Sequence, residues 1–137
     1  MWIFTTHGFY SVTAAGGCKM QIRARVRDHL ERLKSAFHKQ LRGPIIETPD
    51  ADYRYRIIAG RDAWQKVASQ LADEIDYPNF KNAVFNEFGQ DNYETALHRV
   101  WAIMHGLQPR RPLPPESHGR PESYYRSPLE SWYEGEA

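Results

Sequence analysis

Arginines occur at alternate positions in two segments of the sequence. In residues 20–26 and again in residues 53–59, basic and apolar side chains take turns along the chain. Because successive side chains of a β-strand point to opposite faces of the sheet, the arginines of each segment leave it on the side opposite the apolar residues. If both strands turn their apolar sides to one core, four guanidinium groups share the other face. These residues are Arg23, Arg25, Arg54 and Arg56.

A guanidinium group matches a phosphate or a carboxylate with two parallel hydrogen bonds, and it also stacks on nucleic-acid bases. The sequence therefore predicts a surface that binds an anionic partner: RNA, a nucleotide or an acidic peptide. Two alternatives stay open. The arginines could form a solvated face paired with Glu47 and other acids, where each ion pair contributes only about 0–1 kcal/mol. The face could also be covered by the last two helices of the domain.

Three other residues could carry acid–base chemistry. His7 is expected at the tip of a hairpin, Asp76 at a junction between two helices, and His98 on the last predicted helix. A general base needs a partner within hydrogen-bond reach. With such partners these residues would make the protein a small hydrolase or nuclease. The structural alternatives are a plain turn histidine and a helix-capping role for Asp76 or Asn79.

Metal, cofactor and common catalytic signatures are not evident. His98 and His105 lie on one predicted helix but about two turns apart, too far to share a metal ion without a third element, so we expect no metal site. The sequence contains no glycine-rich nucleotide loop, no GxSxG, no HExxH and no CxxC pattern. We therefore expect no cofactor, and a non-enzymatic binding or regulatory module is favoured over an enzyme.

The composition is that of a globular protein with one domain. The chain has 137 residues, of which 41% are hydrophobic and 26% charged, enough for a single core. Lys and Arg total 18 against 17 for Asp and Glu, so any basic surface must be local. The single cysteine, Cys18, excludes an intrachain disulfide, and the sequence has neither a signal peptide nor an apolar run of membrane-spanning length. We expect a cytoplasmic protein that does not interact with membranes.

The hydrophobic pattern predicts five strands and four helices. Strands follow from β-branched and aromatic runs bounded by glycine or proline, and helices from apolar residues at three- and four-residue steps. The predicted strands cover residues 2–6, 9–14, 20–26, 45–48 and 53–59. The predicted helices cover residues 27–41, 62–76, 78–88 and 91–106.

This order of elements predicts an α+β fold. We expect an antiparallel sheet of about five strands with two helices on one face, a relative of the ferredoxin-like arrangement, plus two further C-terminal helices. The compact domain is expected to cover residues 1–108, because residues 109–137 are rich in proline and poor in aliphatic side chains.

The tail, residues 109–137, is expected to be flexible, yet it carries two features that could bind. Residues 111–115 could form a polyproline II segment that docks on an aromatic groove. Four aromatic side chains could pack back on the domain or anchor a protein partner. A third hypothesis is therefore a structural protein that docks on a partner through its tail. The aromatic residues are Tyr124, Tyr125, Trp132 and Tyr133.

Six short segments of residues 1–108 form one pattern. They are Met1–Thr5, Gly8–Val12, Arg23–Arg27, Glu47–Tyr53, Asp76–Lys81 and His98–Trp101. Together they resemble a family of small, uncharacterised bacterial proteins. The resemblance implies a bacterial or phage source and a compact single domain, and it brings no activity, cofactor or catalytic residue with it. The tail lies outside the resemblance.

Overall fold

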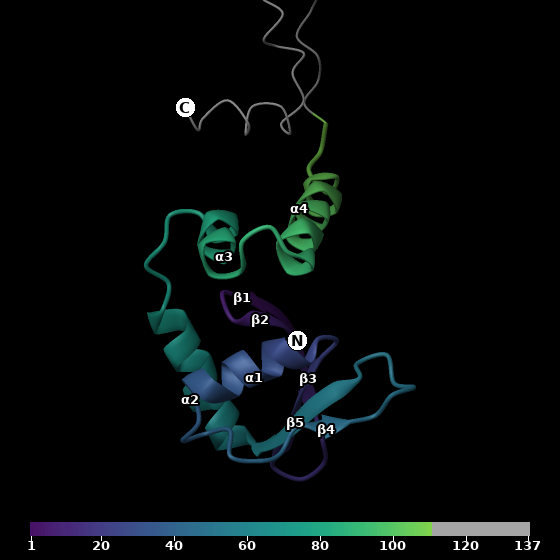
Figure 1. The fold of residues 1–137 in the computed structure, drawn as a ribbon, viewed down its shortest axis with the longest axis vertical. Helices are drawn as coiled ribbons and strands as arrows, with labels where there is room; N and C mark the ends of the chain where they lie inside the picture. The colour runs from purple at the N-terminus through teal and green to yellow at the C-terminus, as the bar shows by residue number, and fades with distance from the viewer. Residues whose placement is uncertain (111–137) are drawn as a thin grey trace, which may run out of the picture. The chain divides into compact units, whose positions relative to one another are not determined.

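The computed structural model describes residues 1–110 of the chain. The chain divides into two compact units, Met1–Met104 and His105–Ala137, and of the second only the first few residues are described. The predicted proline segment 111–115 and the four aromatic residues of the tail lie outside the described part. Figure 1 shows the described elements in chain order.

Five antiparallel strands form one sheet in the order β1-β2-β3-β5-β4. The predicted five-stranded antiparallel sheet is therefore confirmed. β3 and β4 each pair antiparallel with β5, which lies between them, so β3 and β4 run in the same direction, and the helix between them in the chain makes a split βαβ unit of the kind that ferredoxin-like folds use. The strands are β1 (Trp2–Thr5), β2 (Gly8–Ala14), β3 (Lys19–Ala24), β4 (Ile46–Glu47) and β5 (Tyr55–Gly60).

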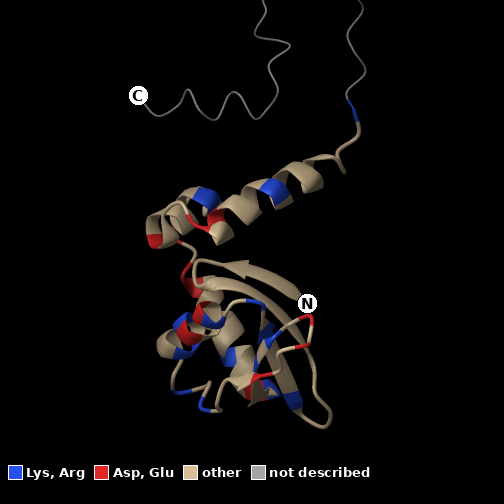
Figure 2. Cartoon of the chain, turned by 45° about the vertical axis from the view of Figure 1, so that its right-hand side comes forward, with Lys and Arg blue, Asp and Glu red and all other residues tan. Residues whose placement is uncertain are grey.

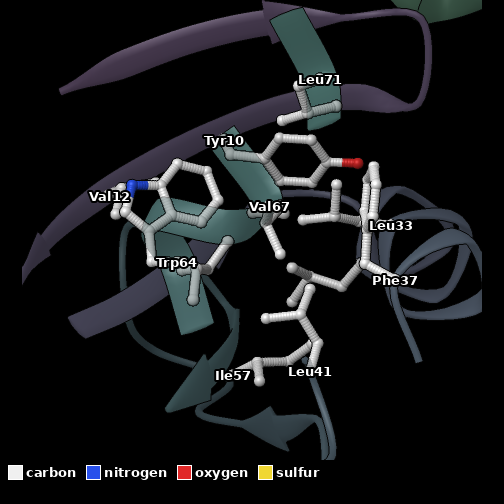
Figure 3. Close-up of a cluster of buried hydrophobic side chains, with 12 residues drawn as sticks. Tyr10, Val12, Leu33, Phe37, Leu41, Ile57, Trp64, Val67 and Leu71 are labelled. Carbon is white, nitrogen blue, oxygen red and sulfur yellow. The ribbon is translucent and has the colours of Figure 1, made fainter. Parts of the chain in front are cut away.

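Two helices cover one face of this sheet, as the sequence predicts. α1 (Arg27–Ala36) and α2 (Arg61–Asp73) both contact β3 and β5, and α1 also contacts β2. The apolar residues of the strands and helices meet in one core, and Figure 3 shows most of these side chains. The buried residues of this main core are Tyr10, Val12, Ile22, Ala24, Leu30, Leu33, Phe37, Leu41, Ile57, Trp64, Val67 and Leu71.

The first helix is shorter than its apolar pattern predicts. The stripe extends to Leu41, but α1 ends at Ala36, because Phe37 leaves helical geometry with φ −122° and ψ 42°. Phe37 and Leu41 are nevertheless buried in the main core. The Lys34 amino group, in the last turn of the helix, donates a 2.6 Å hydrogen bond to the Gly43 carbonyl and ties down the chain on its way to β4.

The last two helices, α3 (Phe80–Phe88) and α4 (Asn92–His105), form a second cluster beside the β1–β2 hairpin (Figure 1). Their buried residues Val84, Tyr93 and Leu97 pack against Phe4 and Phe9 of the hairpin. The Tyr93 hydroxyl also donates a 2.9 Å hydrogen bond to the Thr5 carbonyl. Within residues 1–110, no helix combines the length and hydropathy that a bilayer span requires.

Candidate functional site

The structure places Arg23 and Arg56 side by side on the face of the sheet opposite the main core. Arg23 in β3 and Arg56 in β5 are direct register partners, as are their neighbours Ile22 and Ile57. The two isoleucines are fully buried in the main core, so both arginines point to the other face. Directly opposed side chains of an antiparallel pair lie about 5 Å apart at their β-carbons, so the two arginine side chains leave the sheet next to each other.

Neither arginine of this pair has an acidic partner. Arg23 donates a 2.7 Å hydrogen bond from Nη2 to the Ser11 hydroxyl, and no ion pair joins Arg23 or Arg56 to any acid among residues 1–110. The Nε atoms of both residues are buried without a hydrogen-bond partner. The face therefore carries two adjacent cations whose charge is uncompensated within the described chain. We call Arg23 and Arg56 the arginine pair.

Arg25 and Arg54 each have an acidic partner instead. Arg25 follows β3, and its Nη2 lies 3.0 and 3.2 Å from the two carboxylate oxygens of Asp52. That hydrogen bond raises the pKa of Arg25 above its usual value. Arg54 donates a 2.8 Å hydrogen bond from Nε to Glu47. Both ion pairs are well exposed, so each adds little to stability.

Tyr53 covers the edge of the arginine pair. Its ring lies 4.7 Å from the Arg23 guanidinium carbon and 4.3 Å from that of Arg25, and 6.4 Å from the ring of Phe9. The residue is 6% exposed, and its hydroxyl is buried without a hydrogen-bond partner. Cation–π contacts of this kind hold a guanidinium in place without neutralising it.

The alternation of side chains along a strand predicts the wrong face of the sheet for Tyr53. It places Tyr53 with Tyr55 on the apolar side and Arg54 with Arg56 on the other. In the structure β5 begins only at Tyr55, so alternation does not govern the two residues before it. Tyr53 lies over Arg23, while the Arg54 guanidinium lies 5.8 Å from the ring of Tyr55, which packs against the main core. No feature of the sequence marks this reversal.

The helix side of the molecule has a groove of about 850 Å³ that brings two predicted acid–base residues together. His7 and Asp76 both line the groove, between the β1–β2 turn, α1 and α3. His7 Nε2 lies 2.7 Å from a carboxylate oxygen of Glu74, which sequence reasoning missed because 67 residues separate the pair. His98 does not line the groove and instead contacts Glu94 at 2.6 Å on α4.

Hydroxyl groups of Thr6, Ser35 and Tyr77 line the groove together with the groups that can hold a proton. The other hydrogen bond of His7 runs from its backbone N–H to Thr5, so within residues 1–110 no hydroxyl or thiol is hydrogen-bonded to the His7 ring. No three His, Cys, Asp or Glu side chains of this part of the chain are grouped as a metal site. Asn79, which caps α3 by accepting a 3.1 Å bond from the Asn82 N–H, confirms the capping alternative there. Acid–base chemistry in the groove stays a prediction.

A buried histidine, His29, links α1 to the hairpin and to α4. It is 6% exposed, and its Nδ1 accepts a 3.3 Å hydrogen bond from the Phe9 backbone N–H. Its ring lies 4.7 Å from that of Tyr93. Burial lowers the pKa of His29 below its usual value of 6.5, against the smaller opposing effects of Asp28 and Asp91. The ring is therefore neutral in the folded protein at neutral pH.

This histidine is expected to make the fold less stable in mild acid. The pKa of His29 is lower in the folded than in the unfolded state. Its contribution to the free energy of unfolding is therefore fully present above about pH 6.5 and decreases as the pH falls below that value. Protonating Nδ1 would set two N–H donors against each other at Phe9. Urea unfolding at pH 7.5 and pH 5.5 measures the loss, and in His29→Gln this part of the loss should disappear. An equal pH dependence in the variant would contradict the assignment.

Comparisons of the chain with protein-family models, with curated proteins and with solved structures found no match.

Proposed function

We infer that the protein is a small binding module that holds the phosphate or carboxylate group of an anionic partner at the arginine pair. One observation carries this proposal. Arg23 and Arg56 are direct cross-strand neighbours with no acidic partner among the described residues, and a nitrogen of each is buried without a hydrogen bond. Other arginines of the chain, such as Arg25, Arg27 and Arg54, pair with acids.

In the free protein this arrangement costs stability, and a role in binding explains why it is kept. Like charges directly opposite each other destabilise an antiparallel pair, and a buried polar group without a partner costs about 1–3 kcal/mol. A bound oxyanion relieves the repulsion, because it neutralises the two cations and accepts hydrogen bonds from their terminal N–H groups. The paired strands and the Ser11 hydroxyl position the Arg23 guanidinium before binding.

The charge of the whole chain favours a local mode of binding. The formal net charge is only +1, and Figure 2 shows basic and acidic residues interspersed over the strands and helices. Long-range attraction of a polyanion is therefore weak, and few charges take part at the site. RNA, a nucleotide and an acidic peptide all carry the required oxyanion.

The proposal predicts binding with a shallow dependence on salt. We would titrate the full chain with a short single-stranded RNA, a nucleoside diphosphate and an acidic peptide, each at several KCl concentrations. If about two phosphate contacts form, the logarithm of the RNA affinity should fall with the logarithm of salt with a slope of about −1.4. If none of the three probes binds at the lowest salt concentration, the face is an ordinary solvated surface and the proposal is wrong.

A further inference from the structure

An exposed tryptophan lies in the same cross-sheet row as the arginine pair. Trp2 pairs with Ser11, Ser11 with Arg23, and Arg23 with Arg56, so the four residues form one line across four strands. Trp2 is 69% exposed. Since directly paired residues point to the same face, its indole lies on the face that carries the two guanidinium groups.

The Trp2 ring is supported from the side. Its centroid lies 5.8 Å from that of Phe9 in an edge-to-face arrangement, and Phe9 in turn stacks on Phe4 at 4.6 Å. Phe4 and Phe9 pack against the buried residues of α3 and α4. A tryptophan braced on a fixed aromatic stack, with most of its own surface open, is a rigid platform for another planar group.

The spacing between platform and cations suits a nucleotide chain. Adjacent strands lie about 4.8 Å apart, so Trp2 is about 10 Å from Arg23 and about 14 Å from Arg56 across the sheet. A short stretch of single strand covers this distance with a phosphate at one end and a base at the other. Bases in a duplex are stacked on each other, so only an unpaired strand presents a free ring face.

We propose that this row binds single-stranded nucleic acid, with a phosphate at the arginine pair and a base stacked on Trp2. The inference rests on the proposed function and names its ligand. An acidic peptide satisfies the cations equally well but supplies no planar base for the indole, which is why the row favours a nucleic acid. Stacking accepts every base, so little sequence preference is expected.

The test separates the base from the phosphate. We would measure the affinity of the full chain for an oligothymidylate, for the matching oligouridylate and for an abasic strand of equal length and charge. Trp2→Ala should lower the affinity for both base-containing strands by roughly 5- to 100-fold, and should leave the affinity for the abasic strand unchanged. Trp2→Phe should restore most of the loss. Because Trp2 is largely exposed, these variants should keep the wild-type melting temperature.

Three outcomes distinguish failure of the base subsite, of the nucleic-acid ligand and of the proposed function. Equal binding of the abasic and thymidylate strands, together with no effect of Trp2→Ala, would remove the base subsite and leave the anion site intact. An acidic peptide of equal charge that binds as tightly as the oligonucleotide would overturn the nucleic-acid ligand alone. If Trp2→Ala does not change the affinity and Arg23→Ala/Arg56→Ala binds as tightly as the wild type, the proposed function itself is wrong.

Discussion

Replacing Arg23 and Arg56 together by alanine is expected to lower the affinity for a single-stranded oligonucleotide at least about 100-fold. A hydrogen bond to a charged group contributes about 1.5–3 kcal/mol, so losing two guanidinium partners removes roughly 3 kcal/mol or more, and each 1.4 kcal/mol is a factor of ten. The lysine variant Arg23→Lys/Arg56→Lys should keep only part of the affinity, because an ammonium group keeps the charge but loses the planar fork. Fluorescence anisotropy at low salt measures all three proteins.

The matched control removes the same charge elsewhere. Arg27 pairs with Glu31 on α1, and the exposed Arg42 donates to the Lys39 carbonyl. Arg27→Ala/Arg42→Ala should therefore bind within about twofold of the wild type if the site is local, since two-charge long-range effects at this net charge are small. An equal loss in both double variants would show that only overall charge matters, and would contradict a defined site.

Removing one arginine should not weaken the fold. In the free protein, Arg56 stands directly opposite Arg23 without an acidic partner among the described residues. Arg56→Met keeps an apolar stem of similar length and relieves the repulsion. Its melting temperature should stay equal or rise while binding is lost, which is the pattern of a site kept for function at some cost in stability.

The second large effect is expected at Gly8, where alanine should reduce the free energy of unfolding by about 3 kcal/mol or more. Gly8 has φ +149°, and a β-carbon there would lie 2.4 Å from Cγ of His29. His29 cannot yield, since its ring is packed edge-to-face against Tyr93 and Phe88. Overpacking and an unfavourable backbone conformation each cost about 1–3 kcal/mol. Urea denaturation measures the loss.

Gly16 provides the comparison for Gly8. It also has a positive φ, +86°, but a β-carbon there meets nothing within 4 Å. Gly16→Ala should therefore lose only the conformational part, about 1 kcal/mol. If the two variants lost equal stability, the close contact between the hairpin and His29 would not be a significant constraint on the fold.

The local pattern of the sequence predicts most of the fold. Alternation in β3 and β5 places Arg23 and Arg56 on one face, and their register in the sheet agrees with it. The helix ends also follow local signals: Asn79 caps α3, Gly89 ends it with a φ of +65°, and Asp91 accepts a 2.9 Å bond from the Glu94 N–H at the start of α4. These features depend on side chains a few residues apart, so the sequence alone contains them.

The parts that could not be predicted depend on distant contacts. Tyr53 reaches Arg23 and Phe9 because the chain before β5 is irregular, and no periodic pattern extends into it. The approach of His7 to Glu74 requires the α2–α3 connection to pass beside the first hairpin. Ion pairing could not be predicted either, because alternation shows that Arg23 and Arg56 point away from the main core but not which arginines find an acid.

The most direct test of the arginine pair is its own side-chain signal. Arginine Nε–Hε groups give separate cross-peaks in ¹⁵N-correlated NMR spectra, and Arg-to-Lys variants assign them. On titration with a single-stranded oligonucleotide, the Nε–Hε peaks of Arg23 and Arg56 should shift together and saturate at one equivalent, while those of Arg27 and Arg42 stay in place. Unmoved peaks for the pair at saturation, or equal shifts for all four, would contradict an anion site between β3 and β5.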